Sequence, residues 1–307
     1  MGRRTINAYK LTFNKMRKSD DVLSPADLNG TSLIDIVESW AKNQEERGLF
    51  EFRDDIHGAI REVKRFNNNI LIVKAESGKS GEQGTLYDVN GNSADIPINE
   101  KQVATSFCRA VLFCPTRGQM SLWFSEYSGR SSSAKNVLDL LEKQWRQISA
   151  GVKFTKSRVR LSEYFLENAD VREIEVRLNR RSSDLADSVK SIPGTLSHSL
   201  RPERGHRFPG GLLRRLQNKP SLAFDYLEIP EKSDSYEVFA EVKLGGRTRK
   251  IKVANPEQSF YYYEELNGSN DPVLTDNELI HHCIEEVTEY FERSNLCWEP
   301  EWSKEAR

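Results

Sequence analysis

The sequence predicts an α+β fold with antiparallel sheets, packed helices and two globular parts. Short apolar or alternating segments recur along the chain with turn residues between them, which is typical of antiparallel strands. Three longer segments carry apolar residues at helical spacing. A length of 307 residues is enough for two medium domains. A predicted helix ends near residue 148, and the segments after it are strands separated by a long irregular stretch. We therefore expect an N-terminal domain at 1–150 and a C-terminal domain at 151–307.

The first domain should contain a sheet with two helices. Residues 7–14 alternate in polarity and predict a half-buried strand. A helix capped by Thr31 should extend to Arg47, because its apolar residues recur at helical spacing. Four more strands are predicted at Asn69 to Glu76, Thr85 to Val89, Ala110 to Cys114 and Met120 to Tyr127, the last two forming a hairpin. After a serine-rich turn, residues 137–148 predict a second amphipathic helix.

The second domain should combine strands with a long irregular segment. Strands are predicted near Val171 to Leu178, Leu222 to Ile229, Tyr236 to Leu244 and Arg249 to Ala254, with a hairpin turn at Gly245-Gly246. The stretch between the first two is rich in glycine, proline and arginine, and long irregular segments are usually functional or mobile. Thr275 to Glu278 has the pattern of a capping box and predicts an acidic C-terminal helix in this domain.

Composition places the chain among ordinary folded proteins of the cytoplasm. It has 37% apolar and 30% charged residues, and its apolar runs are far shorter than the roughly 20 residues that span a bilayer. The basic N-terminus is not followed by the apolar segment of an export signal. Four widely spaced cysteines show no metal or disulfide pattern. We expect reduced, structural thiols, and neither a metal nor another cofactor.

The charges are unevenly distributed along the chain. Lys and Arg outnumber Asp and Glu by 21 to 19 in residues 1–150 and by 21 to 14 in residues 151–252. In residues 253–307 the count is 3 against 13. A positive middle beside a negative tail is typical of a surface that binds a polyanion.

The basic middle is therefore the predicted nucleic-acid site. A guanidinium group matches phosphate oxygens with a planar fork of donors, and several such groups release counterions from a nucleic-acid backbone. The chain shows no recognition helix, zinc finger or aromatic RNA-binding motif that would recognise bases. We therefore expect contacts to phosphate rather than to bases. The predicted DNA-binding residues are Arg180, Arg181, Arg201, Arg204, Arg207, Arg214, Arg215, Lys219, Arg247, Arg249, Lys250 and Lys252.

Other motifs are weaker. Gly78-Lys79-Ser80 lacks the upstream glycine and the following helix of a phosphate-binding loop, so we interpret it as a hairpin turn. Asp225, Glu241 and Lys243 could form a magnesium-dependent nuclease site if they met on adjacent strands. His281 and His282 each precede a glutamate by four residues, which favours ion pairing on a helix face over a metal site.

The order of elements resembles that of the RexA proteins of phage exclusion systems and, more remotely, of the ring-forming RdgC DNA-binding proteins. The likeness lies in three features: the hairpin of residues 110–127 that leads into the helix of residues 137–145, the predicted strand Phe224 to Ile229, and the tail Pro272 to Glu278 that opens the last helix. The central segment departs from that family because it is longer and richer in glycine and arginine.

The resemblance implies a prophage-encoded homodimer that binds double-stranded DNA without strong sequence preference and protects its host against superinfection. It also implies a membrane-embedded partner similar to RexB, and no small-molecule substrate. The predicted function is thus non-enzymatic DNA binding. Two alternatives stay open: the magnesium-dependent nuclease, and a protein-interaction factor whose basic middle docks on the acidic tail of another copy.

Overall fold

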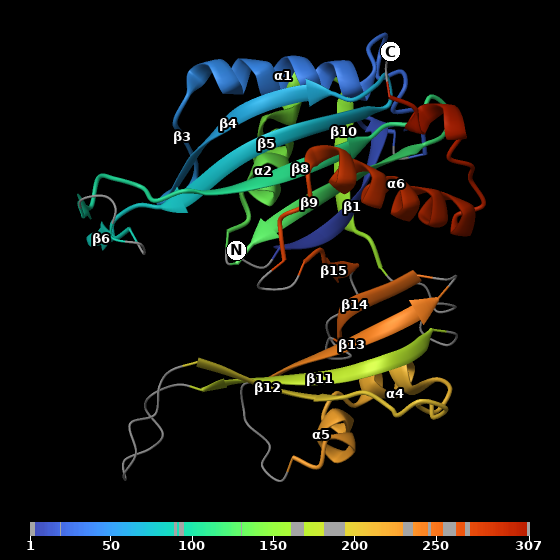
Figure 1. Ribbon diagram of the computed structural model, residues 1–307. Helices are drawn as coiled ribbons and strands as arrows, with labels where there is room; N and C mark the ends of the chain where they lie inside the picture. The colour runs from blue at the N-terminus through green and yellow to red at the C-terminus, as the bar shows by residue number, and fades with distance from the viewer. Residues whose placement is uncertain are drawn as a thin grey trace. The chain divides into compact units, whose positions relative to one another are not determined.

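The computed structural model describes residues 4–18, 20–88, 91, 95–129, 131–160, 169–180, 194–229, 236–244, 247–253, 262–267 and 271–305. It confirms the α+β class (Figure 1). The chain divides into two compact units: unit 1 is Met1–Arg158 with Leu266–Arg307, and unit 2 is Val159–Glu265. No helix among the described residues is long and apolar enough to cross a membrane.

The predicted domain boundary was wrong for the C-terminal helix. Helix α6 (Asp276–Arg293) belongs to unit 1 and not to a C-terminal domain that begins at residue 151. The capping box predicted at its start is present, since the Thr275 hydroxyl accepts a hydrogen bond from the backbone N–H of Glu278 and the Glu278 carboxylate accepts one from that of Thr275. The local signal fixed where the helix begins, but only tertiary packing fixes which unit contains it.

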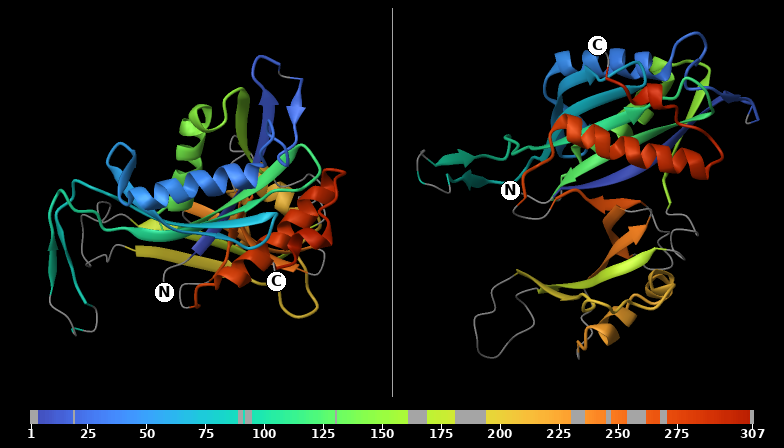
Figure 2. Two further views of the ribbon diagram at one scale, coloured as in Figure 1. Left: turned by 90° about the horizontal axis from the view of Figure 1, so that it is seen from above. Right: turned by 45° about the vertical axis from the view of Figure 1, so that its right-hand side comes forward.

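Unit 1 is built on a curled antiparallel sheet. Its strands lie in the order β10 (Val152–Arg158), β1 (Arg4–Lys15), β9 (Met120–Ser128), β8 (Ser106–Phe113), β5 (Ile70–Lys79), β4 (Ile56–Arg65) and β3 (Phe50–Arg53), with β2 (Val22–Leu23) also paired to β1. A separate ribbon of β6 (Gly84–Leu86) and β7 (Ile96–Ile98) extends away from this sheet (Figure 2). The predicted strands are present, whereas β2, β3, β4, β7 and β10 were not predicted.

Helices cover both faces of this sheet. Helices α1 (Leu33–Arg47) and α2 (Ser133–Ile148) pack on one face around the buried side chains of Leu11, Leu112 and Trp123. Helix α6 crosses the other face, in front of the strands in Figure 1, and is followed by the 3₁₀ helix η1 (Pro300–Ser303). On that face the ring of Trp298 lies 5.6 Å from that of Phe113 and 5.5 Å from that of Phe291.

Strand β1 is half-buried over residues 9–14, as predicted, whereas residues 5–9 are buried on both sides. Tyr9, Leu11 and Phe13 face the core of α1 and α2. Ile6 and Ala8 on the opposite side are also buried, at 1% and 3% exposure. Only the first half of the strand is therefore covered on both faces of the sheet, which the alternation in the sequence does not reveal.

A buried ion pair fixes the start of α6 to the sheet. The guanidinium of Arg109 on β8 is 3% exposed and donates from Nη2 and Nε to the two carboxylate oxygens of Glu126 on β9, at 2.7 and 2.9 Å. Its Nη1 donates to the carbonyl of Leu274 and lies 3.3 Å from the carboxylate of Asp276. One guanidinium thus joins two strands to the helix N-terminus, where a carboxylate is already favourable.

The Gly78-Lys79-Ser80 motif has a structural role at the end of β5. Gly78 and Lys79 end β5, so the predicted hairpin turn was wrong, and β6 follows rather than a helix. A Cβ on Gly78 would lie 2.0 Å from the backbone oxygen of Ala104. The glycine is required by this close approach of two backbone segments.

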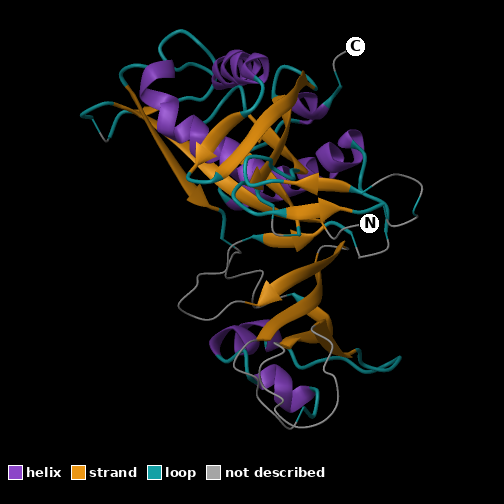
Figure 3. Cartoon of the chain, turned by 90° about the vertical axis from the view of Figure 1, so that its left-hand side faces the viewer, coloured by secondary structure: helices purple, strands orange, loops and turns teal. Residues whose placement is uncertain are grey.

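In the part of unit 2 that the structure describes, two short helices lie on one side of a four-stranded antiparallel sheet (Figure 3). The strand order is β12 (Gly194–Leu200), β11 (Asp170–Arg180), β13 (Tyr236–Leu244) and β14 (Arg247–Val253). Helices α4 (Leu212–Asn218) and α5 (Leu222–Tyr226) pack on it, and β15 (Tyr263–Glu265) ends the unit. β13 and β14 form the predicted hairpin, whose turn at Gly245-Gly246 lies outside the described residues.

The strand predicted at residues 222–229 was wrong. This segment forms α5 and a turn, in which Ala223 and Phe224 are buried against the sheet. A short apolar run fits a buried strand and a buried helix equally well, and Leu222, Ala223, Phe224 and Leu227 also match one side of a helix. The resemblance to the exclusion proteins rested in part on this segment.

Replacing Arg109 with Met should destabilise unit 1 by about 3–5 kcal/mol, because the Glu126 carboxylate would stay buried without its main partner. All five tryptophans, at 40, 123, 145, 298 and 302, lie in unit 1, so fluorescence during urea unfolding reports on this unit alone. Arg61→Met is the matched control. The Arg61 side chain is 56% exposed where it pairs with Glu76, and its loss should cost under about 1 kcal/mol. Equal midpoints for the two variants would contradict a structural role of the buried pair.

Replacing Gly78 with Ala should destabilise unit 1 by about 1–3 kcal/mol through the clash with Ala104. Gly84 in β6 is a matched control, since a Cβ there meets no atom within 4 Å. The same fluorescence measurement should show Gly84→Ala unfolding at or near the parent midpoint. A Gly78→Ala protein as stable as the parent would mean that the two segments are farther apart.

Candidate functional site

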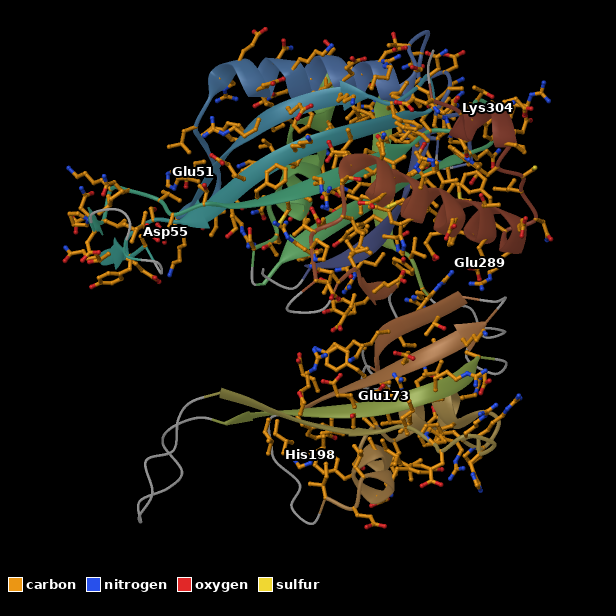
Figure 4. All side chains as sticks on the ribbon, in the orientation of Figure 1. Glu51, Asp55, Glu173, His198, Glu289 and Lys304 are labelled. Carbon is orange, nitrogen blue, oxygen red and sulfur yellow. The ribbon has the colours of Figure 1, made fainter. Side chains whose placement is uncertain are left out.

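The two faces of the sheet in unit 2 differ in chemistry. Ile174, Val176, Ala240 and Val242 point toward α4 and α5 and are buried. The residues between them point to the opposite side, which we call the charged face. Its charged members are Glu173, Glu175, Arg177, Glu237, Glu241, Lys243, Lys250 and Lys252, and the buried Phe239 lies among them. Glu173 and His198, labelled in Figure 4, lie on opposite faces, because Glu173 pairs in register with Glu241 and His198 with Val176.

Most cations of the charged face are already paired. Lys250 forms an ion pair with Glu175, and Lys252 forms one with Glu237. Arg177 donates from Nε to Glu175 at 2.5 Å, and its guanidinium carbon lies 4.0 Å from the centre of the Phe239 ring. The charged face is therefore a network of internal pairs that offers little free positive charge.

One end of the charged face is hollowed into a cleft of about 450 Å³, which we call the arginine cleft. Residues from β11, β13, β14 and the segment that follows β12 form its walls. The lining residues are Val171, Arg172, Arg201, Pro202, Glu203, Arg204, Gly205, His206, Arg207, Glu241, Lys243 and Thr248. Five cations thus face two carboxylates around one concave surface.

The cations of the arginine cleft fall into two groups. Arg172 pairs with Asp170 at 2.7 Å, and Arg201 pairs with Glu173 at 2.6 Å and with Glu241 at 3.6 Å. Arg204, Arg207 and Lys243 are exposed and have no ion pair with any residue that the structure describes. These three side chains are available for an anionic ligand.

The loop that carries Arg204 and Arg207 is anchored at three points. Arg201 is held by Glu173, as noted above. Phe208 packs edge-on against Tyr226 of α5, with ring centres 5.9 Å apart. Leu212 and Leu213 begin α4 and are buried in the core. Between these anchors Gly205 has φ of +93°, a left-handed turn conformation that favours glycine, and the turn leaves both arginines at the cleft.

The structure brings together only part of the predicted basic set. Arg201, Arg204 and Arg207 line the cleft, whereas Lys250 and Lys252 are paired with glutamates. Arg214, Arg215 and Lys219 belong to α4 or follow it, and α4 packs on the other face of the sheet. Arg249 is buried at 7% exposure on that same face, so its prediction as a phosphate contact was wrong. Arg181 lies outside the described residues, as do the side chains of Arg180 and Arg247.

Sequence reasoning missed two members of the cleft. Arg172 was not selected, although it lies in the predicted strand, and Lys243 was considered only as a nuclease residue. Arg172 lies at the β-bulge between Val171 and Glu173, and a bulge changes the direction in which a side chain points. That bulge cannot be read from the residue types alone.

The charge asymmetry of the sequence does not persist in the folded units. Unit 2 contains 18 Lys and Arg against 17 Asp and Glu, and unit 1 contains 27 against 29. The net charges are therefore +1 and −2 without histidine. The positive potential of unit 2 is local to the arginine cleft rather than a property of the whole unit.

The three residues of the nuclease alternative are not assembled. Glu241 lies on the charged face and Lys243 follows it on the same side of β13. Asp225 is on α5, which packs on the opposite face of the sheet, because its neighbour Phe224 is buried against Ala240 and Val242. A metal ion cannot bridge carboxylates that lie on opposite faces of a sheet.

Several acidic and nucleophilic residues of unit 1 have structural surroundings. Asp276 binds Arg109 and Lys74, and the His281 ring accepts or donates a hydrogen bond at the Asn277 carbonyl while its edge faces Phe66. Cys108, Cys114 and Cys283 are buried, as predicted, and burial raises the pKa of the Cys114 thiol to about 11. No group of three or more potential metal ligands occurs among the residues that the structure describes.

The chain was compared with protein-family models, with curated proteins and with solved structures, and none of the three comparisons finds a match. The arginine cleft is therefore interpreted from its own residues.

Proposed function

We propose that the protein binds DNA through phosphate groups at the arginine cleft of unit 2. The observation that carries this proposal is that three exposed cations, Arg204, Arg207 and Lys243, line one concave surface and have no ion pair with a described residue. Guanidinium and ammonium groups in a preformed cleft match phosphate oxygens in charge and in donor geometry. Base recognition is not part of the proposal, since phosphate contacts carry no sequence information.

The resemblance to phage exclusion proteins supports the same function independently of the cleft. Association as a homodimer, preference for double-stranded DNA, defence against superinfection and a membrane-embedded partner are predictions from that resemblance. They concern the biological setting, whereas the cleft concerns the contact itself. The protein-interaction alternative finds less support, because the acidic residues Asp276 and Glu289 are engaged within unit 1.

Replacing both Arg204 and Arg207 with Ala should weaken DNA binding about tenfold or more and by the same factor for unrelated duplexes. Each lost phosphate contact should also reduce the slope of log K against log salt concentration by about 0.9. Fluorescence anisotropy with labelled duplexes over a salt series measures both quantities.

Arg215→Ala with Lys219→Ala is the matched control, because it removes two exposed cations that do not line the cleft. This variant should bind like the parent. If the control loses as much affinity as the cleft variant, the contact surface includes α4. If neither variant nor the parent binds any duplex, DNA binding itself is wrong.

A further inference from the structure

The arginine cleft has the size of a small-ligand site. Its volume of about 450 Å³ lies within the range of roughly 300–1,000 Å³ that is usual for pockets that enclose a small molecule. A DNA duplex presents grooves about 6–12 Å wide and a continuous backbone, and it would rest on the rim of such a cleft rather than enter it. A strand end or a single nucleotide can enter.

The carboxylates around the cleft oppose a continuous polyanion. Glu203 and Glu241 line the cleft, and Asp170 and Glu173 lie beside it as partners of Arg172 and Arg201. Each strand of DNA carries a negative charge about every 3.4 Å along the axis, so the phosphates next to a bound one would approach these carboxylates. One isolated phosphate group avoids that repulsion.

The free cations match the terminal form of phosphate. A phosphate monoester carries a charge of about −1.5 to −2 near neutral pH and presents three acceptor oxygens. A phosphodiester has one charge and two unbridged oxygens. Arg204 and Arg207 on the loop after β12 offer two guanidinium forks and Lys243 on β13 offers one ammonium, a donor set that suits three oxygens better than two.

We infer that the arginine cleft binds a phosphate monoester, as carried by a 5′-phosphorylated strand end or a free mononucleotide, in preference to the internal phosphodiesters of DNA. This rests on the proposed function where the strand end is the source, because it names which phosphate of the DNA the cleft takes. Arg204, Arg207 and Lys243 bind the terminal oxygens, and the carboxylates in and beside the cleft repel a strand that continues past it.

The test compares two blunt duplexes of one sequence, labelled at a 3′ end, one with 5′-phosphates and one with 5′-hydroxyls. Anisotropy is measured with the full chain, with Arg204→Ala/Arg207→Ala and with the control Arg215→Ala/Lys219→Ala. The parent and the control should bind the phosphorylated duplex about tenfold more tightly than the hydroxyl duplex. The cleft variant should lose this preference and keep the circular dichroism of the parent. A deoxynucleoside monophosphate should compete, and the unphosphorylated deoxynucleoside should not.

The outcomes separate this inference from the proposed function. Equal binding of the two duplexes, with both weakened in the cleft variant, overturns the inference and leaves DNA binding in place. Binding of the free monophosphate without binding of either duplex supports the monoester site and overturns DNA binding. A preference for the phosphorylated duplex that survives in the cleft variant overturns the placement of the site. Absence of binding to every probe overturns both proposals.

Discussion

The alternation of side chains along the strands determines where each helix can pack and where a ligand can bind. In unit 1 the central strands carry apolar side chains on both sides, so α1 and α2 cover one face and α6 covers the other. In unit 2, α4 and α5 pack on the apolar face, and the opposite face is mostly charged around the buried Phe239. Neither helix that the structure describes in unit 2 packs on the second face, where the charged side chains pair with one another. The arginine cleft lies at one end of this face.

Pairing, rather than the number of cations, decides what the charged face can bind. Arg177, Lys250 and Lys252 are each held by a glutamate of the same sheet, and breaking such a pair to bind a phosphate would leave a carboxylate without its partner. Arg204 and Arg207, on the loop after β12, have no ion pair with any residue that the structure describes. With a net charge near zero over unit 2, long-range attraction of a polyanion is weak, and short-range contacts at the cleft have to supply the affinity.

The sequence predicted the local elements better than their assembly. The helices that became α1, α2 and α6 were recognised from helical spacing, although Ser32 and not the predicted Thr31 caps α1. Half of the strands β1–β10 were recognised from alternating or apolar segments. Strand β4 was missed because Gly58 and several charged residues interrupt its pattern, and residues 222–229 were misassigned because four apolar residues within six fit either structure. The location of α6 in unit 1 depends on contacts with residues more than 100 positions away, such as that between Arg109 and Asp276, which no local pattern encodes. For the site, the sequence showed that arginines were close together along the chain, but not which face of a sheet each would reach.

The position of the free arginines depends on packing that the ligand never touches. The loop from Arg201 to Gly211 leaves the charged face and enters the apolar one, where Phe208 meets Tyr226 and Leu212 begins α4. Its two ends are thus fixed on opposite faces of the sheet, and the left-handed turn at Gly205 sets the path between them. A loop held in this way loses less conformational entropy when an anion binds than a free loop of the same composition would. The apolar core beneath the sheet therefore contributes to the charged cleft above it, because it places the two guanidinium groups before any ligand arrives.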